Sequence, residues 1–343
     1  MYSESDIDGA VAAGVMPRDV ATAFRNHVAG GRMTPAVDEE HFRLLTGFND
    51  IFVTIAIGLL LAAVSQIGDW IMEPFAGAFV AIAAWGLAEY FTRVRRMALP
   101  SIVLLLAFVG GVAATMIGVM IHFNIDVSDR LDALIAAGIA LVTAGAAWLH
   151  WRRFMVPITV AAGAVALVGM VVALVLVAVP TIENSMWPLL LIGGLAVFAL
   201  AMRWDMSDRT RETRRADVAF WLHLAAAPMI AHPIFQMLGV FDPDVGVGIA
   251  AVVIALYLVF AFVALAVDRR ALLVSGLVYV LYAMWAVFRS AGAIDLGWAL
   301  TGLVIGAALL TLSAFWHPMR RWVVGTLGSL GDRLPPVQTM LPA

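Results

Sequence analysis

Three observations on the sequence predict an all-α fold, a polytopic transmembrane helical bundle of about ten spans. Hydrophobic residues make up 63% of the 343 residues and charged residues only 13%, whereas a soluble domain has roughly 45–50% and 25%. The apolar residues form stretches long enough to cross the roughly 30 Å of bilayer hydrocarbon. Nearly all of the arginine lies outside these stretches, in the polar connections between them and in the two terminal segments. A bilayer accommodates this composition because lipid-facing positions are apolar as well as core-facing ones.

The composition also excludes several kinds of site. Cysteine is absent, which removes disulfides, thiolate metal sites and a cysteine nucleophile. Lysine is absent as well, since all 21 basic residues are arginine, and this removes Schiff-base cofactors and the lysine of a phosphate-binding loop. The net charge of −3 argues against a nucleic-acid partner. We therefore expect no cofactor, no metal site and no nucleic-acid binding.

Residues 1–45 are predicted to form a small cytoplasmic helical hairpin plus a linker. The stretch "SESDIDGAVAAG" has a polar start and a glycine stop at Gly14, and "MPRDVATAFRNHVAGG" has Pro17 near its first turn. Such a hairpin is too small to fold firmly alone, so residues 3–30 are expected to dock on the membrane domain or on a protein partner. No cleavable signal peptide is expected, because no apolar core follows a basic start.

The motif "AAGVMPRDVATAF", followed by apolar spans joined by arginine-containing turns, resembles bacterial multi-pass inner-membrane proteins of unknown function. The resemblance covers the N-terminal segment and the general layout. It implies a multi-pass protein of the bacterial inner (cytoplasmic) membrane. It supplies no functional residue, because no chemistry is established for those proteins.

The transmembrane domain is predicted over residues 46–318, followed by a flexible cytoplasmic tail over 319–343. If the spans alternate in direction, 19 of the 21 arginines fall on one side of the membrane, and the positive-inside rule then places both termini in the cytoplasm. Ten spans are predicted, near residues 48–67, 73–92, 99–122, 131–150, 155–179, 186–203, 217–239, 245–267, 271–288 and 296–316.

Paired arginines recur along the membrane domain, at 95–96, 152–153, 214–215, 269–270 and 320–321. Two of these turns, "RRMALPSIV" and "RRFMVPITV", also place a proline four residues after the second arginine. One interpretation is duplication of a two-helix hairpin. The other is that cytoplasmic turns attract arginine and that proline favours the first helical turn. The sequence leaves both open, and neither gives the inverted repeat of many transporters.

The seventh span, "FWLHLAAAPMIAHPIF", carries two prolines at membrane depth. Pro228 and Pro233 remove the hydrogen bonds to the carbonyls of Leu224 and Met229, and those carbonyls need other partners in a bilayer. One interpretation is a kinked helix whose histidines support packing. The other is a broken helix that lines a polar cavity, as in transporters.

Helix geometry separates the two histidines of this span. His223 and His232 are nine residues apart, about two and a half turns, so they face opposite ways on an ideal helix. His232 and Gln236 are four apart and share a face. This pair, beside the carbonyl freed by Pro233, is the better candidate for lining a cavity.

The ninth span offers companions for that face. Ser275, Tyr279 and Tyr282 lie at positions i, i+4 and i+7, and a buried tyrosine hydroxyl needs a hydrogen-bond partner. Aromatic anchoring at the membrane interface is the alternative interpretation for these rings.

Polar candidates on the cytoplasmic side have structural alternatives too. Asn49 and Asp50 open the first span, where Asp50 can complement the helix N-terminus. Glu89 lies near the cytoplasmic end of the second span, four residues before Arg93, a spacing that favours an ion pair on the helix surface. The small-residue spacings Gly110-Ala114-Gly118 and Gly302-Gly306 predict close helix packing.

These residues support three hypotheses of function. The first is a permease- or channel-like protein with a small polar cavity near the seventh span. The second is a non-catalytic scaffold, or a subunit of a larger membrane complex or oligomer. The third is a haem b protein with axial histidines, paired as His150 with His223 or as His122 with His232. No catalytic motif such as HExxH or GxSxG occurs, so we expect no enzyme and name no catalytic residue.

Overall fold

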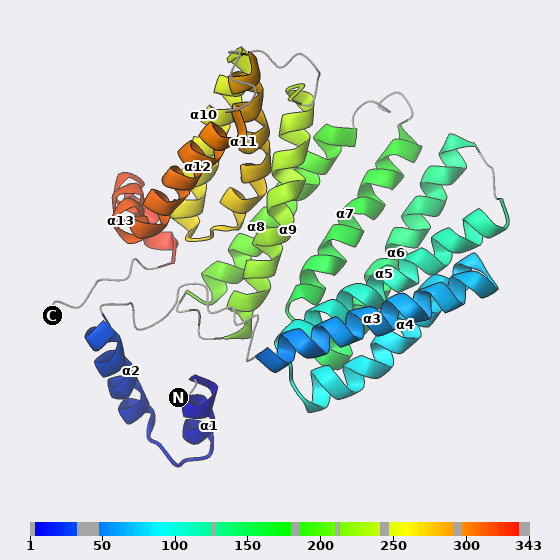
Figure 1. The fold of residues 1–343 in the computed structure, drawn as a ribbon, viewed down its shortest axis with the longest axis horizontal. Helices are drawn as coiled ribbons and strands as arrows, with labels where there is room; N and C mark the ends of the chain where they lie inside the picture. Colours follow the sequence, from blue (N-terminus) through cyan, green and yellow to red (C-terminus); the bar gives the residue numbers. More distant parts are fainter. Residues whose placement is uncertain are drawn as a thin grey trace. The chain divides into compact units, whose positions relative to one another are not determined.

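The structure, a computed structural model, describes most of the chain in eight stretches. Within them the chain is helical and contains no strand, as predicted. The chain divides into two units, Met1–His41 with Val337–Ala343, and Phe42–Pro336 (Figure 1). The described residues are 4–32, 48–124, 128–179, 186–209, 211, 213–240, 247–290 and 297–335.

The first unit contains the two helices expected before the membrane domain, α1 (Glu4–Ala12) and α2 (Arg18–Arg32). Gly14, in a left-handed conformation with φ of 71°, follows the first of them. The Arg25 guanidinium donates a hydrogen bond to Asp8 over 2.6 Å. This pair joins the two helices into a hairpin. The predicted linker falls largely on residues outside the described part of the chain.

Each of the ten predicted spans largely coincides with one α-helix of the second unit. Seven of these helices, α3 to α9, are long and apolar enough to cross a membrane, and α12 with α13 makes an eighth if that pair, bent by 75°, is counted as one span. The described residues therefore form a helical membrane domain with seven or eight candidate spans. The helices are α3 (Phe48–Ile71), α4 (Glu73–Ala88), α5 (Ala98–His122), α6 (Asp129–Phe154), α7 (Ile158–Ala178), α8 (Met186–Ser207), α9 (Arg214–Met237), α10 (Val247–Val267), α11 (Ala271–Ser290), α12 (Gly297–Ala314) and α13 (Trp316–Thr326).

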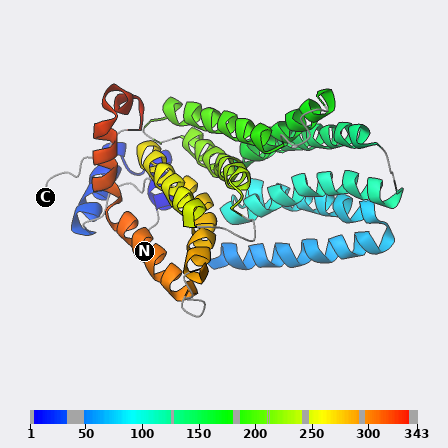
Figure 2. The same ribbon diagram turned by 90° about the horizontal axis from the view of Figure 1, so that it is seen from above.

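Extensive packing joins helices that are consecutive in the chain, and four such pairs are α4 with α5, α6 with α7, α8 with α9, and α10 with α11. Figures 1 and 2 show α4 beside α5 and α8 beside α9. The turn inside each of the four pairs contains one non-glycine residue in the left-handed region: Arg96, Met155, Arg211 or Asp268. A left-handed residue is a common way to end a helix, and here it recurs at each of these arginine-containing turns.

Close packing between α4 and α5 rests on glycine, but only partly on the glycines that the sequence spacing indicated. A Cβ atom built on Gly77 would lie 2.5 Å from the Gly111 carbonyl oxygen, and one built on Gly118 would lie 2.9 Å from the Pro74 Cα. Gly118 was in a predicted packing motif, whereas Gly77 and Gly111 were not. By contrast, a Cβ on Gly110 meets no described atom within 4 Å.

The same is true of Gly302 and Gly306 on α12. The packing prediction for these two residues is wrong. A small-residue spacing permits close approach, but whether a second helix faces that side depends on tertiary structure.

The end of the chain also differs from the expected flexible tail over 319–343. Helix α13 and a 3-10 helical turn, η3 (Gly328–Arg333), occupy its first part. Trp316 and Val323 are buried in a core cluster with Ala227 of α9 and Leu265 of α10. This burial explains why residues 316–326 form a helix, because a short helix is stabilised when its amphipathic face packs against other helices.

Candidate functional site

Helix α9 occupies the centre of the candidate site and runs unbroken from Arg214 to Met237 through both prolines. It is the most buried of the seven candidate spans. Pro233 is buried, whereas Pro228 is exposed. The hypothesis of a broken helix is therefore corrected to a continuous helix that lacks two internal hydrogen bonds.

The carbonyl freed by Pro233 lies against a glycine of the neighbouring helix. A Cβ built on Gly194 of α8 would lie 2.8 Å from the Met229 carbonyl oxygen. The backbone of α8 thus approaches this oxygen directly, which allows weak Cα–H···O contacts. Close contact with a second helix explains how α9 continues where its own hydrogen-bond ladder is interrupted.

Three residues predicted from the sequence, His232, Gln236 and Tyr279, meet near the C-terminal end of α9. The His232 Nδ1 atom lies 2.7 Å from the Tyr279 hydroxyl of α11, and the Gln236 amide nitrogen lies 3.5 Å from His232 Nε2. The Trp187 ring of α8 meets the imidazole edge-on at 5.1 Å, and Phe235 stacks on Tyr279 at 4.3 Å. If the Gln236 amide donates to Nε2, the Nδ1–H donates to the tyrosine oxygen. The arrangement is a hydrogen-bonded chain from α9 to α11.

The other two predicted residues of α11 are placed differently. Tyr282 lies in ring contact with Trp285 at 5.9 Å. The side chain of Ser275 is outside the described part of the structure.

A second cluster of polar side chains surrounds His223, near the N-terminal end of α9. The His223 Nε2 atom lies 2.9 Å from one carboxylate oxygen of Asp205 on α8. Arg269 donates to both oxygens of the same carboxylate, through Nη2 at 2.5 Å and Nε at 3.2 Å. The side chains of Asp205 and His223 are fully buried, and that of Arg269 is 3% exposed. His223 was a predicted candidate, but its two charged partners were not.

Asp268, in the turn between α10 and α11, forms a second centre of charge. It accepts a hydrogen bond from Arg211 at 3.0 Å and one from the Trp316 indole at 2.9 Å. The Arg320 Nε atom of α13 lies 3.3 Å from the same carboxylate. We call Asp205, His223, Arg211, Asp268, Arg269 and Arg320 the buried charge cluster.

The buried charge cluster contains two carboxylates and three guanidinium groups. Burial lowers the pKa of the Arg211 guanidinium and the nearby Arg269 lowers it further, whereas Asp268 and Asp205 raise it. Charges away from water are stable only when paired and fully hydrogen-bonded. The cluster therefore ties together the start of α9, the end of α8, the α10–α11 turn and α13.

The beginning of α9 is fixed by a conventional cap. Thr213 is the N-cap residue, and its hydroxyl accepts from the Arg215 amide. Asp208 accepts from both the Thr213 amide at 2.9 Å and its hydroxyl at 2.6 Å. These bonds satisfy groups that a helix start leaves unpaired and fix the position from which His223 projects.

The Nδ1 atom of His223 is buried and has no described hydrogen-bond partner. Its other nitrogen contacts the Asp205 carboxylate, which can only accept, so Nε2 carries a proton. Nδ1 of the neutral ring is then a proton acceptor, and the Phe198 ring packs against the imidazole at 5.2 Å. A histidine held by a carboxylate with its second nitrogen open can bind and release a proton.

No family model, curated protein or solved structure matches the chain.

The sequence indicated a role for Asp205, but the predicted sixth span ended before this residue. The predicted sixth span ended at residue 203, but α8 continues to Ser207, so Asp205 lies in the helix and not in a loop. Asp268 directly precedes the Arg269–Arg270 pair, between the predicted eighth and ninth spans. An acid placed beside arginine at the end of an apolar stretch is the pattern that could have indicated both.

The cytoplasmic-side candidates lie in another part of the domain. Glu89 begins a π-helical turn, η1 (Glu89–Val94), at the end of α4. It accepts from Arg153 at 2.6 and 2.8 Å and from the predicted partner Arg93 at 3.3 Å. Asp50 is buried and Asn49 is exposed in the first turn of α3. Glu89 therefore links the α4–α5 turn to the end of α6.

The Glu89→Gln variant is expected to lower the apparent melting temperature in detergent, but by less than variants of Asp205. The Glu89 side chain is 33% exposed and its partner Arg153 is 40% exposed, and water weakens ion pairs at such sites. Fluorescence-detected gel filtration after heating measures the difference. A loss as large as that of an Asp205 variant would contradict this assignment.

The four histidines of the haem hypothesis have separate surroundings. His150 is buried among Trp85, Phe108 and Phe154. His122 Nδ1 lies 2.7 Å from Glu73, while His223 and His232 contact Asp205 and Tyr279. In the part of the chain that the structure describes, no group of three or more His, Asp or Glu could hold a metal ion.

Proposed function

We propose that this chain is a permease- or channel-like protein of the bacterial inner membrane, with ten spans and cytoplasmic termini, in which α9 carries a path for protons. The observation that carries the proposal is the buried Asp205–His223 pair with an open Nδ1 atom. Ionisable groups at membrane depth are costly, and where they occur they commonly serve proton relays or substrate pathways. The left-handed arginine turns support construction from duplicated hairpins.

In this proposal Asp205 holds one tautomer of His223 and stabilises its protonated form. A proton that reaches Nδ1 makes an imidazolium ion, whose charge is balanced by the carboxylate 2.9 Å away. Arg269 competes for the same carboxylate, so it limits how tightly the proton is held. This balance suits a group that must bind a proton and release it again.

His232 and Tyr279 form the second proton-binding site of the proposed path. The two histidines are nine positions apart, about 13.5 Å along a helix, and several α9 side chains in this interval, including Ala227 and Ile230, are buried. A proton can pass only if α9 moves and admits water. Pro228 and Pro233 favour such a movement, because each removes a hydrogen bond that would hold the helix straight.

The His223→Gln variant is expected to lose proton flux without losing the fold. Glutamine places an amide donor near the Nε2 position, so the bond to Asp205 is retained, but it cannot take up a proton at neutral pH. Wild-type and variant protein are reconstituted in liposomes containing a pH-sensitive dye, and the dye signal is followed after a pH step. The flux should fall at least tenfold.

The His317→Gln variant serves as the matched control, because His317 lies on α13 outside the buried charge cluster. It should keep the wild-type flux. If wild-type protein moved no more protons than protein-free liposomes, the proposal would fail. The alternative, a scaffold or subunit of a larger complex, would then be favoured, with the separate α1–α2 unit as the segment that binds a protein partner.

A further inference from the structure

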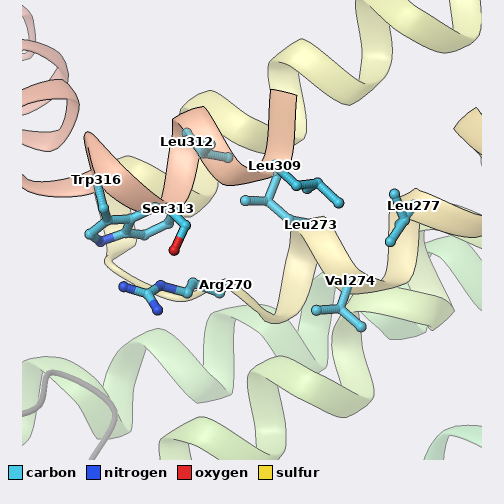
Figure 3. A pocket seen from close by; sticks show the side chains of 8 residues that line it. All are labelled: Arg270, Leu273, Val274, Leu277, Leu309, Leu312, Ser313 and Trp316. Atoms are coloured by element: carbon cyan, nitrogen blue, oxygen red, sulfur yellow. The ribbon is translucent and has the colours of Figure 1, made fainter. Parts of the chain in front are cut away.

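A pocket of about 200 Å³ opens between α11 and α12, apart from both histidine sites. Four residues from each side line it at the same spacing, i, i+3, i+4 and i+7, so the lining residues of α11 share one face of that helix, as do those of α12. Arg270 directly precedes α11, and Trp316 is the first residue of α13. Figure 3 shows these side chains. They are Arg270, Leu273, Val274 and Leu277 on one side and Leu309, Leu312, Ser313 and Trp316 on the other.

The pocket has one polar end and one apolar end. Arg270, Ser313 and Trp316 gather at one end, and Leu277 and Val274 lie at the other (Figure 3). The lining between them is aliphatic. A site that changes from cationic to aliphatic along its length is complementary to a molecule with an anionic head and an apolar tail.

Arg270 is held at the polar end by an aromatic ring. Its guanidinium lies 4.9 Å from the centroid of the Trp316 ring, a cation–π contact, and its side chain is exposed. The Trp316 indole nitrogen donates to Asp268, which fixes the ring. Arg270 thus stands at the surface, whereas the neighbouring Arg269 is buried with Asp205.

The polar end lies where the chain has the features of a membrane interface. Helix α13 begins at Trp316, after a bend of 75° from α12. Trp316, Arg320 and Val323 are buried on one side of α13, while Met319 and Trp322 are exposed. An amphipathic helix with exposed tryptophan and arginine beside a span is typical of the headgroup region.

We propose that this pocket binds one acyl chain of an anionic membrane phospholipid, whose phosphate contacts Arg270. Guanidinium groups bind phosphate through charge-assisted hydrogen bonds. The volume of about 200 Å³ is below the roughly 300–1,000 Å³ of pockets that enclose a drug-sized ligand. It therefore accommodates part of one chain, while the rest of the lipid remains in the bilayer.

Native mass spectrometry of delipidated protein tests this site with phosphatidylglycerol and phosphatidylcholine of identical chains. The wild-type protein should retain phosphatidylglycerol more strongly. Arg270→Gln should weaken phosphatidylglycerol binding about tenfold, the effect expected for one lost charge-assisted bond, and leave phosphatidylcholine unchanged. Arg321→Gln, which removes an exposed arginine of α13 away from the pocket, is the matched control and should have no effect.

A second variant tests the apolar end. Val274 is 61% exposed, so Val274→Trp should fill the pocket without disturbing a core, and it should reduce the binding of both lipids. Equal binding of the two lipids by wild-type protein, or unchanged binding by Arg270→Gln, would overturn the phosphate contact. Full lipid retention by Val274→Trp, or complete competition by inorganic phosphate, would overturn the acyl-chain site.

Discussion

The Asp205→Ala variant is expected to lose about 3–5 kcal/mol of folding free energy, the range for removing one partner of a buried ion pair. Asp205 is fully buried and is bonded to both His223 and Arg269. Without the carboxylate, the Arg269 guanidinium stays in the protein interior with its charge uncompensated. The remaining bond from Arg269, to the Ala216 carbonyl at 3.3 Å, is too weak to compensate for the loss.

The loss is measured as the apparent melting temperature of the purified protein, followed by fluorescence-detected gel filtration. Asp132→Ala is the matched control, since Asp132 is exposed on α6 and its removal should change little. The double variant Asp205→Leu with Arg269→Met should be more stable than Asp205→Ala, because a buried ion pair replaced by apolar groups of similar size leaves no uncompensated charge. If Asp205→Ala had the same apparent melting temperature as the wild type, the buried charge cluster could not hold these helices together.

Local periodicity accounts for what the sequence predicted well. A membrane-spanning helix can be predicted from little more than length and composition, and seven or eight of the predicted spans correspond to helices long and apolar enough to cross a membrane. The contact between His232 and Gln236 follows from a four-residue spacing on one helix. Tyr279 could be proposed as a neighbour because a buried hydroxyl needs a partner, although the bond itself joins residues 47 positions apart.

The buried charge cluster could not be predicted in the same way. Asp205 and Arg269 are 64 positions apart, as the chain runs through α9 and α10 before returning to the same end of the bundle. Periodicity within one helix carries no information on such a pairing. Asp205 and Asp268 could be recognised in the sequence as acidic residues close to arginine-containing turns. Which residues they pair with depends on how four segments of the chain pack.

The seventh span shows the same division between local and tertiary information. The rule for proline correctly identified which carbonyls lose a bond. It could not say that Gly194 would bring α8 against the Met229 carbonyl, so a break in the helix was as reasonable as a continuous one. The sequence thus located the residues of the candidate site, and the packing of α8 and α11 on α9 determined their contacts.

Gly77→Val is expected to destabilise the domain by about 3 kcal/mol, at the upper end of the usual range for overpacking. A Cβ on Gly77 would lie 2.5 Å from the Gly111 carbonyl oxygen and 2.8 Å from the Ala114 carbonyl carbon. Both are backbone atoms, so no side-chain rotation can relieve the clash. Helices α4 and α5 would have to separate along their contact, which is the most extensive between any two described helices.

Gly86→Val on the same helix provides the control for this variant. A Cβ on Gly86 meets no described atom within 4 Å, so this change adds the same side chain to α4 without a clash. The effect of valine on helix propensity is common to both variants. The difference in melting temperature between the two therefore reports the backbone contact at Gly77. Equal melting temperatures would mean that α4 and α5 do not approach as closely as Gly77 and Gly111 require.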